Sequence, residues 1–314
     1  MPRPLFYCDH YEIPLPPGHR FPARKYGMLR QRLAETGNFH FQPAPLAVAG
    51  QIGLIHDPDY VQAFLDGCLP AEAMRRIGFP WSEALVLRTL ASVGGTLAAA
   101  ETALDDGWGG SLAGGTHHAF RAWGSGFCVF NDLAVAIASL RTGGRIRRAA
   151  VVDLDVHQGD GTAELFAGEP DVLTLSLHGR NNFPFRKRRS RIDVALPDGA
   201  GDGEYLAALA EVLPAVFAFR PEVVFYQGGV DALAEDRLGR LNLTHAGLAR
   251  RDRMVMEACR RNGVPFVVTL GGGYAEPVEL TVEAHAATYL AACEGNARFD
   301  ERKRGGAAAI AADH

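Results

Sequence analysis

Short runs that are apolar on both faces are the feature that most constrains the fold of this chain. The segments 147–156, 221–229 and 264–273 are rich in valine, and their apolar residues do not alternate with polar ones. Strands of this composition are buried on both sides, which is typical of parallel sheets with helices on each face. The sequence therefore predicts an α/β fold.

Predicted strands and helices alternate along the chain. Further strands are expected at 5–8, 111–115 and 171–178. Helical patterns occur at 24–36, 57–66, 81–105, 130–142, 203–218, 244–262 and 277–292. This alternation indicates βαβ units and one mostly parallel central sheet flanked by helices on both faces. We predict a single domain over residues 1–295, followed by a flexible tail over 296–314 that is first charged and then alanine-rich.

Composition narrows the class of protein. Apolar residues make up 47% of the chain and charged residues 22%, as in a soluble globular protein. No apolar run approaches the ~18 residues of a membrane span, and the first residues lack the pattern of a secretory signal. The five cysteines are scattered, which fits a reducing compartment. The net charge of −4 gives no sign of nucleic-acid binding. We expect a cytoplasmic protein without membrane or nucleic-acid partners.

Polar residues follow four of the predicted strands. The segments after the strands are "THH" (116–118), "HQGDG" (157–161), "VDALAED" (230–236) and "YAEP" (274–277). In open α/β sheets, ligands bind outside the carboxyl ends of the strands. These four loops are therefore expected to meet at one edge of the sheet and to form the functional site.

The stretch "VVDLDVHQGDGT" (151–162) predicts a metal site. In a strand, Asp153, Asp155 and His157 would project to the same side, because side chains alternate with a period of two. Asp155 and His157 offer an oxygen and a nitrogen, which suit zinc, and Asp231 is the best third ligand because it follows the strand at 221–229 directly. Three protein ligands leave one position open for water, as in catalytic sites. The alternative is a helix N-terminus capped by Asp160, with the other acids solvated.

Two adjacent histidines, His117 and His118, are candidates for proton transfer. A metal with two carboxylate ligands keeps little net positive charge, so it acidifies water weakly and a separate general base is needed. Neighbouring imidazoles require partners that fix their tautomers. Asp153 and Asp160 are the unassigned acids, and each is expected to orient one of the two histidines.

Six motifs of this sequence resemble those of the zinc-dependent histone deacetylase family, which has the arginase/deacetylase α/β fold. They are "GGTHHAF" (114–120), "GFCVFND" (126–132), "VVDLDVHQGDGT" (151–162), "LSLH" (175–178), "QGGVDALAEDRLGRLNLT" (227–244) and "LGGGY" (270–274). The resemblance extends from about residue 18 to about residue 285. The segment from His19 to Gly27 and the short loops are most similar to class IV-like bacterial deacetylases.

The resemblance implies a role for each motif residue at the metal. Asp155, His157 and Asp231 would bind the catalytic zinc. His118, backed by Asp160, would be the general base and later the general acid. His117, paired with Asp153, would act mainly through its charge. Tyr274 matches the tyrosine that hydrogen-bonds the scissile carbonyl.

The resemblance also implies a substrate channel and a second cation site. Gly126 and Phe127 would form one wall of a narrow acyl-lysine channel, and Phe183 or Phe185 the opposite wall. Gly272 is a further expected substrate-binding residue. The residues expected to hold a structural K⁺ ion are Asp153, Asp155, His157, Ser176 and Leu177.

The implied activity is hydrolysis of an acyl group, acetyl or longer, from the lysine side-chain amine of proteins or peptides. Hydroxamates are expected to bind as inhibitors. The alternative within the superfamily is an acetylpolyamine or other small acylated-amine deacylase. A binuclear manganese enzyme of the arginase type is disfavoured, because Leu233 replaces the second acid of its Asp-x-Asp motif. An inactive acyl-binding module is disfavoured because every ligand, both histidines and Tyr274 are present.

The basic stretch "FRKRRSR" (185–191) allows two interpretations. The simpler one is a solvated basic loop. The other places it at the rim of the channel, where its charge would repel basic histone-like tails and attract acidic or neutral partners.

Overall fold

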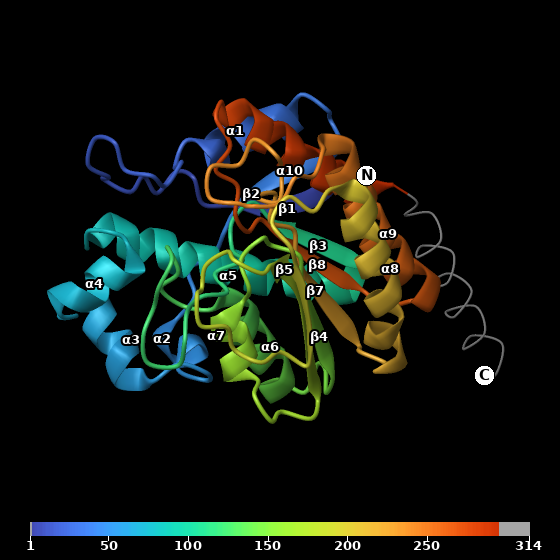
Figure 1. The fold of residues 1–314 in the computed structure, drawn as a ribbon. Coiled ribbons are helices and arrows are strands. Elements are labelled where there is room, and N and C mark those ends of the chain that lie inside the picture. The colour runs from blue at the N-terminus through green and yellow to red at the C-terminus, as the bar shows by residue number, and fades with distance from the viewer. Residues whose placement is uncertain (1, 295–314) are drawn as a thin grey trace.

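Eight strands form one sheet at the centre of the molecule (Figure 1). This computed structural model describes residues 2–294, so the predicted tail, 296–314, lies outside the described residues. The strands are β1 (Arg3–Tyr7), β2 (Phe39–Pro43), β3 (Trp108–Ser111), β4 (Ala149–Asp153), β5 (Val172–Gly179), β6 (Ile192–Leu196), β7 (Val223–Gln227) and β8 (Phe266–Thr269). They follow the order β2-β1-β3-β8-β7-β4-β5-β6, and every neighbouring pair is parallel. The predicted parallel α/β sheet is confirmed.

Helices cover both faces of the sheet (Figure 1). One hydrophobic cluster joins the sheet to α1 (Lys25–Ala34), α8 (Asp202–Ala218), α9 (His245–Asn262) and α10 (Val278–Cys293). The opposite cluster joins it to α5 (Glu83–Asp106) and α6 (Asp132–Thr142). Four short helices complete the fold, namely α2 (Ala49–Ile52), α3 (Pro58–Leu65), α4 (Ala71–Ile77) and α7 (Asp160–Leu165).

The central strands are buried on both faces, as their composition predicts. In β4, Ala150 and Val152 belong to one hydrophobic cluster, whereas Ala149 and Val151 belong to the other. All four residues are at most 1% exposed. The two faces of each central strand therefore contribute to two separate cores, which explains why polar residues do not interrupt these runs.

The structure corrects several predicted boundaries. The strand expected at 111–115 is β3, at Trp108–Ser111, and β4 ends at Asp153 instead of continuing to residue 156. The edge strands β2 and β6 and the short helices α2, α4 and α7 were not predicted. The glycine-rich sequence of β3 hides its strand character, yet Gly109 is required there because a Cβ would collide with the Ala99 carbonyl of α5.

The helix α5 has sharply defined ends. The Ser82 side chain accepts a hydrogen bond from the Leu85 N–H at its start, and Gly107 ends it with a φ of 90°. By length and composition alone, α5 is the one helix of the described residues that could cross a membrane. It packs against β3 and α6 in the interior, and a core helix passes the same test.

A buried arginine of α9 donates hydrogen bonds to both loops that follow β4 and β7. Arg251 is fully buried, and its Nη1 donates to the carbonyl oxygens of Gly229, at 2.6 Å, and Leu154, at 3.2 Å. Its Nε donates to the Asp252 carboxylate at 2.8 Å. Leu154 directly precedes Asp155, and Gly229 lies two residues before Asp231. The guanidinium therefore fixes the spacing of the two segments that carry the predicted metal ligands.

We predict that Arg251→Met lowers the free energy of unfolding by about 3–5 kcal/mol, because it leaves the Asp252 carboxylate buried without its cation. The matched control is Arg253→Met on the same helix, where an exposed pair with Glu294 at 2.9 Å is worth about 0–1 kcal/mol. Urea denaturation followed by circular dichroism measures both. Equal stability of the two variants would show that Arg251 does not hold these loops.

Candidate active site

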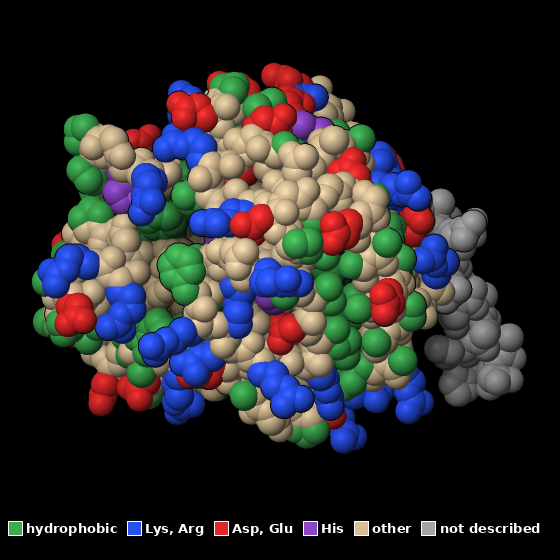
Figure 2. Space-filling model, in the orientation of Figure 1, with side chains coloured by type: hydrophobic (Ala, Val, Ile, Leu, Met, Phe, Trp, Pro, Cys, Tyr) green, Lys and Arg blue, Asp and Glu red, His purple; other side chains and the backbone are tan. Residues whose placement is uncertain are grey.

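One large cavity opens at the carboxyl ends of the strands, on the hollowed face of the molecule (Figure 2). Its volume is about 720 Å³, within the range of substrate-binding sites. The predicted metal ligands, both histidines and Tyr274 all line it. The prediction that the polar loops after β3, β4, β7 and β8 meet at one edge of the sheet is therefore correct.

The loop after β4 brings its acids together by local hydrogen bonds. Asp153 is the last residue of the strand, and its Oδ1 accepts from the Asp155 N–H at 3.2 Å. Asp155 Oδ1 in turn accepts from the His157 N–H at 3.0 Å. Such Asp-to-backbone contacts two residues ahead turn the chain. The expectation that all three residues continue a strand is wrong, because these turns place Asp155 and His157 in a loop.

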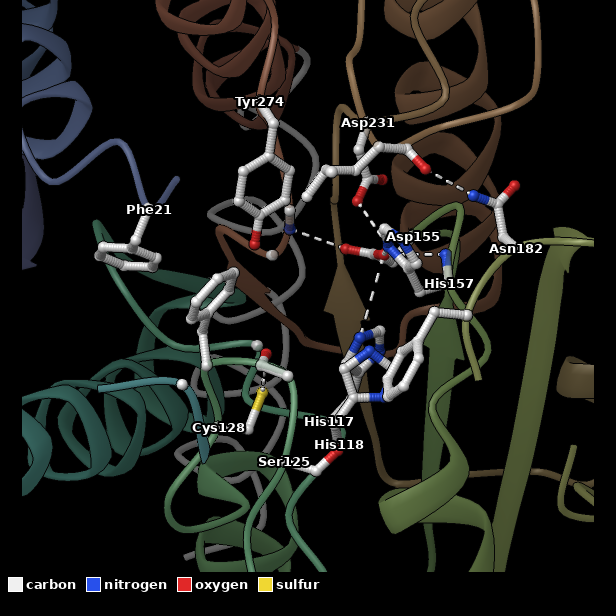
Figure 3. Close-up of a pocket in the computed structure, with 18 of the residues that line it drawn as sticks. Phe21, His117, His118, Ser125, Cys128, Asp155, His157, Asn182, Asp231 and Tyr274 are labelled. Atoms are coloured by element: carbon white, nitrogen blue, oxygen red, sulfur yellow. Dashed lines mark hydrogen bonds and ion pairs between the residues drawn. The ribbon is translucent and has the colours of Figure 1, made fainter. Parts of the chain in front are cut away.

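Asp155, His157 and Asp231 form a cluster that can hold a metal ion (Figure 3). One ligand atom from each lies within 4.8 Å of the others, and all three side chains are buried. His157 Nδ1 is 3.1 Å from Asp155 Oδ1 and 3.0 Å from Asp231 Oδ2. Within residues 2–294 this is the one such group of three, so the described residues offer no second metal site of the arginase type.

The charges of this cluster favour a cation. Burial and the neighbouring Asp155 carboxylate raise the pKa of Asp231 to about 7. Burial alone would lower the pKa of His157, but the Asp155 and Asp231 carboxylates outweigh it and raise that pKa to about 10. One nitrogen and two oxygen donors, crowded and buried, match the ligand preferences of zinc.

Each of the two adjacent histidines is paired with an aspartate at the base of the cavity. His117 Nδ1 lies 2.7 Å from Asp153 Oδ2, and His118 Nδ1 lies 2.7 Å from Asp160 Oδ1. Both contacts use the Nδ1 atom, and His117 Nε2 lies 3.9 Å from Asp155 Oδ1. Asp160 is the first residue of α7, which Gly159 precedes as the N-cap. The capping role considered for Asp160 is therefore wrong, and its carboxylate faces His118.

The two imidazoles have opposite proton affinities. Burial would lower the pKa of His117, but the Asp153 and Asp155 carboxylates raise it to about 9. For His118, burial and the positive charge of His117 lower the pKa to about 4, although Asp160 acts in the other direction. The Asp153 and Asp155 carboxylates therefore favour the protonated form of His117, whereas burial favours the neutral form of His118, which can accept a proton.

Aromatic side chains line the approach to this base. The Phe183 ring lies 4.9 Å from the His118 ring, and the Phe127 ring lies 6.2 Å from the Tyr274 ring. Phe127 has a φ of 65°, a conformation that non-glycine residues rarely adopt. Gly126 lies so close to His118 and Phe183 that a Cβ would crowd both rings. Phe185 also lines the cavity but is 84% exposed, so Phe183 is the closer wall.

Glycines after β7 and β8 allow the backbone to approach the metal ligands. The Gly272 N–H donates to Asp155 Oδ2 at 2.7 Å, and a Cβ on Gly272 would collide with the Asp231 carboxylate. Gly272 therefore positions a predicted metal ligand, and the substrate contact expected of it stays a prediction. The Val156 N–H donates to Asp231 Oδ1 at 2.9 Å, so each ligand carboxylate is held by a backbone amide.

The residues expected at a potassium site lie side by side. Asp153 of β4 is the register partner of Ser176 of β5, and Leu177 follows it, fully buried. Ser176 Oγ contacts His178 Nδ1 at 3.0 Å. Potassium binding at this position stays a prediction.

Lys25, which the sequence pattern did not reveal as a site residue, is buried beside the predicted metal cluster. Its Nζ donates to the carbonyl oxygens of Gly271, at 3.4 Å, and Gly273, at 3.3 Å, and lies 5.3 Å from the Tyr274 ring. Burial lowers its pKa to about 8, although Asp231 and Asp236 act against this shift. The available signal was a lysine at the start of an otherwise apolar face of α1, which it shares with Leu29 and Leu33.

Comparison with known proteins identifies the family. The family model of the histone deacetylase domain matches residues 19–290. The chain belongs to the histone deacetylase family. The resemblance seen in the six motifs is thereby confirmed, and the chain has the amidohydrolase fold of that family, which supports a hydrolase.

Relatives of this histone deacetylase family member occur in bacteria and in plants. It is 45% identical over 294 residues to an uncharacterized protein of Picosynechococcus, a match that covers 92% of this chain and 98% of that protein. It is 33% identical over 253 residues to the acetoin utilization protein AcuC of Bacillus subtilis, covering 73% and 65%. It is 38% identical over 188 residues to histone deacetylase 2 of Arabidopsis thaliana, covering 58% and 48%.

A solved structure confirms the fold. The crystal structure of acetylpolyamine aminohydrolase from Burkholderia pseudomallei superposes with a TM-score of 0.78 and covers 93% of this chain and 99% of that chain. The sequence identity is 20%, so this likeness concerns the fold alone.

We predict that Lys25→Met lowers kcat about ten-fold or more while KM changes little, because the Gly271–Tyr274 segment loses its anchor and small misplacements are costly. The neighbouring Arg24→Met, which alters an exposed side chain, is the control and is expected to keep kcat. Steady-state kinetics on one acyl-lysine peptide measures both. Unchanged kcat in Lys25→Met would contradict this positioning role.

Proposed function

We propose that this protein is a zinc-dependent hydrolase that removes an acyl group, acetyl or longer, from the side-chain amine of lysine. The observation that carries the proposal is the common orientation of four groups toward one cavity. The three residues of the metal cluster, Tyr274, and His117 and His118, each paired with an aspartate, all line the same cavity. General acid–base catalysis beside a metal needs this set of groups.

Zinc fits the donor set of Asp155, His157 and Asp231. Ligand atoms about 2.0–2.2 Å from one tetrahedral ion lie roughly 3.3–3.6 Å from each other. Here, His157 Nδ1 lies 3.0 Å from Asp231 Oδ2, and the three ligand atoms lie within 4.8 Å of one another. When bound, zinc would supply Lewis-acid chemistry, which polarises an amide carbonyl and acidifies water.

Different side chains of the protein then carry out the separate steps of amide hydrolysis. His118, neutral at physiological pH, takes the proton from the attacking water through Nε2, while Asp160 fixes the orientation of the ring. The charged His117 stabilises the negative charge that develops on the former carbonyl oxygen. The Tyr274 hydroxyl donates a hydrogen bond to the same oxygen. His118 finally returns its proton to the leaving amine, and the products are a carboxylate and a free lysine.

The walls of the cavity suit an acylated lysine. Phe127 stands on the Tyr274 side and Phe183 on the His118 side, so a linear aliphatic chain can pass between two aromatic rings. Such a chain has no polar groups between the backbone and the amide. Aromatic walls therefore bury it without leaving hydrogen-bond donors unpaired.

The second candidate function is hydrolysis of a small acylated amine. It is favoured by the volume of about 720 Å³, which is more than a single extended side chain fills. The relative from Burkholderia pseudomallei is named for acetylpolyamines, but it shares the fold alone. Steady-state kinetics with an acetylated diamine and with an acyl-lysine peptide as substrates distinguish the two candidate functions.

We predict that Tyr274→Phe lowers kcat/KM on a fluorogenic acyl-lysine peptide by about 10²–10³-fold, because one donor to the oxyanion is lost. Zinc content and the melting temperature are expected to stay at the wild-type values. Tyr11→Phe, which removes a hydroxyl from a residue outside the cavity lining, is the control and keeps full activity. A hydroxamate should abolish wild-type turnover.

Two results would contradict the proposal. Full activity of Tyr274→Phe would remove the tyrosine from the mechanism. Hydrolysis of the acetylated diamine with a higher kcat/KM than any acyl-lysine peptide would favour the second candidate function.

A further inference from the structure

Five arginines stand around the opening of the cavity. They belong to three separate parts of the chain, namely the segment before α1, the end of α4 and the loop after β7, and we call them the arginine rim: Arg20, Arg75, Arg76, Arg237 and Arg240. All five side chains are exposed. Figure 2 shows Lys and Arg side chains around the hollow on this face.

Acidic residues neutralise the arginine rim only in part. Arg20 and Arg75 have no ion pair within the described part of the chain. Arg76 approaches Glu72 only to 3.8 Å, and both side chains are well exposed. Arg237 pairs with Glu276 at 2.7 Å, and Arg240 pairs with Asp198 at 3.3 Å, again in solvent. The acidic residues that line the cavity itself are the two metal ligands at its base.

The basic loop at 185–191 does not supply this charge. Phe185 is its contribution to the described cavity wall. Lys187 Nζ donates to the carbonyl oxygens of Asn182 and Pro184, and Arg188 pairs with Glu164 at 2.9 Å. The basic side chains of this loop therefore do not line the cavity, and the arginines that do line it come from other segments of the chain.

We propose that the arginine rim selects acyl-lysine residues that are flanked on both sides by acidic residues in a peptide chain. This inference rests on the proposed deacylase function and names its substrate class. Arginine binds carboxylates with paired N–H donors, and the summed positive field draws anionic substrates to the opening. The same field repels lysine-rich tails and polyamines, whose charges would face the rim while the acyl-amine occupies the channel.

The arrangement of the rim favours a peptide over a small anionic amide. Arg20, the pair Arg75 and Arg76, and the pair Arg237 and Arg240 come from different segments around the opening. A peptide that presents an acyl-lysine extends in two directions from the channel, so acidic residues before and after the lysine reach different arginines. A small amide with one carboxylate reaches one side only.

The test compares three acetyl-lysine peptides of equal length, with Asp/Glu, Gly/Ser or Lys/Arg residues on both sides, and 6-acetamidohexanoate as a small anionic amide. We expect kcat/KM to be about ten-fold or more higher for the acidic than for the basic peptide at low salt. The ratio should shrink toward unity at about 0.5 M NaCl, because salt screens exposed charges.

A double variant tests whether the rim arginines cause the preference for acidic peptides. Arg20→Glu with Arg75→Glu should lower the acidic-to-basic ratio of kcat/KM by about ten-fold or more, and Arg75→Gln alone should lower it by a smaller factor. The control carries the same charge change on α9, which lies away from α4 in Figure 1, as Arg250→Glu with Arg261→Glu. This control should keep the wild-type ratio, since charges distant from the opening are screened.

The possible outcomes separate the two proposals. Equal kcat/KM for all three peptides would overturn the acidic-substrate inference while leaving the deacylase function intact. A ratio that the α9 control changes as much as the rim variant does would overturn it as well. A higher kcat/KM for 6-acetamidohexanoate than for the acidic peptide would overturn the peptide assignment. Absence of turnover on every peptide would refute the proposed function itself.

Discussion

The burial of two carboxylates and an imidazole in one cluster is the constraint on which this structure depends. Asp155 and Asp231 are at most 1% exposed, and their charges would repel each other at this separation without a cation. The surrounding fold stabilises these two carboxylates in part by hydrogen bonds. Backbone amides of Val156 and Gly272 bind the two carboxylates, and the buried Arg251 holds the carbonyls beside them. We propose that a metal ion supplies the remaining stabilisation, which is the basis of the proposed chemistry.

The same cluster sets the properties of the histidines next to it. Carboxylates on one side keep His117 charged, and this charge together with burial keeps His118 neutral. Two adjacent residues of the same type therefore acquire different roles from their partners, Asp153 and Asp160. Both partners lie in the stretch that also carries Asp155 and His157, so one loop organises the metal ligands and the proton-transfer groups together.

Much of this could be predicted from the sequence because it is encoded locally. Valine-rich strands and contiguous motifs carry their own signal, and they identified the parallel sheet and the residues that meet at its edge. The strand β3 was misplaced because Gly109 serves a close helix contact and leaves no apolar pattern. The edge strands β2 and β6 were missed because partial exposure breaks their apolar runs.

What escaped prediction at the site depends on distant segments coming together. Lys25 lies almost 250 positions from the carbonyls that it binds, and its sequence context is that of an ordinary helix start. The arginine rim consists of arginines from three segments, and none of these segments is notably basic by itself. The run of basic residues at 185–191 is obvious in the sequence, but its charged side chains do not line the cavity. Only the three-dimensional arrangement distinguishes these two kinds of positive charge.

Metal content of the purified protein tests the central claim most directly. Elemental analysis should find one zinc ion per chain in the wild type and in Asp236→Asn, which alters a nearby buried carboxylate outside the cluster. Asp231→Asn should retain about a tenth of the zinc or less while keeping its circular dichroism spectrum. Two metal ions per chain, or full zinc occupancy in Asp231→Asn, would contradict the assignment of Asp155, His157 and Asp231 as the catalytic metal site.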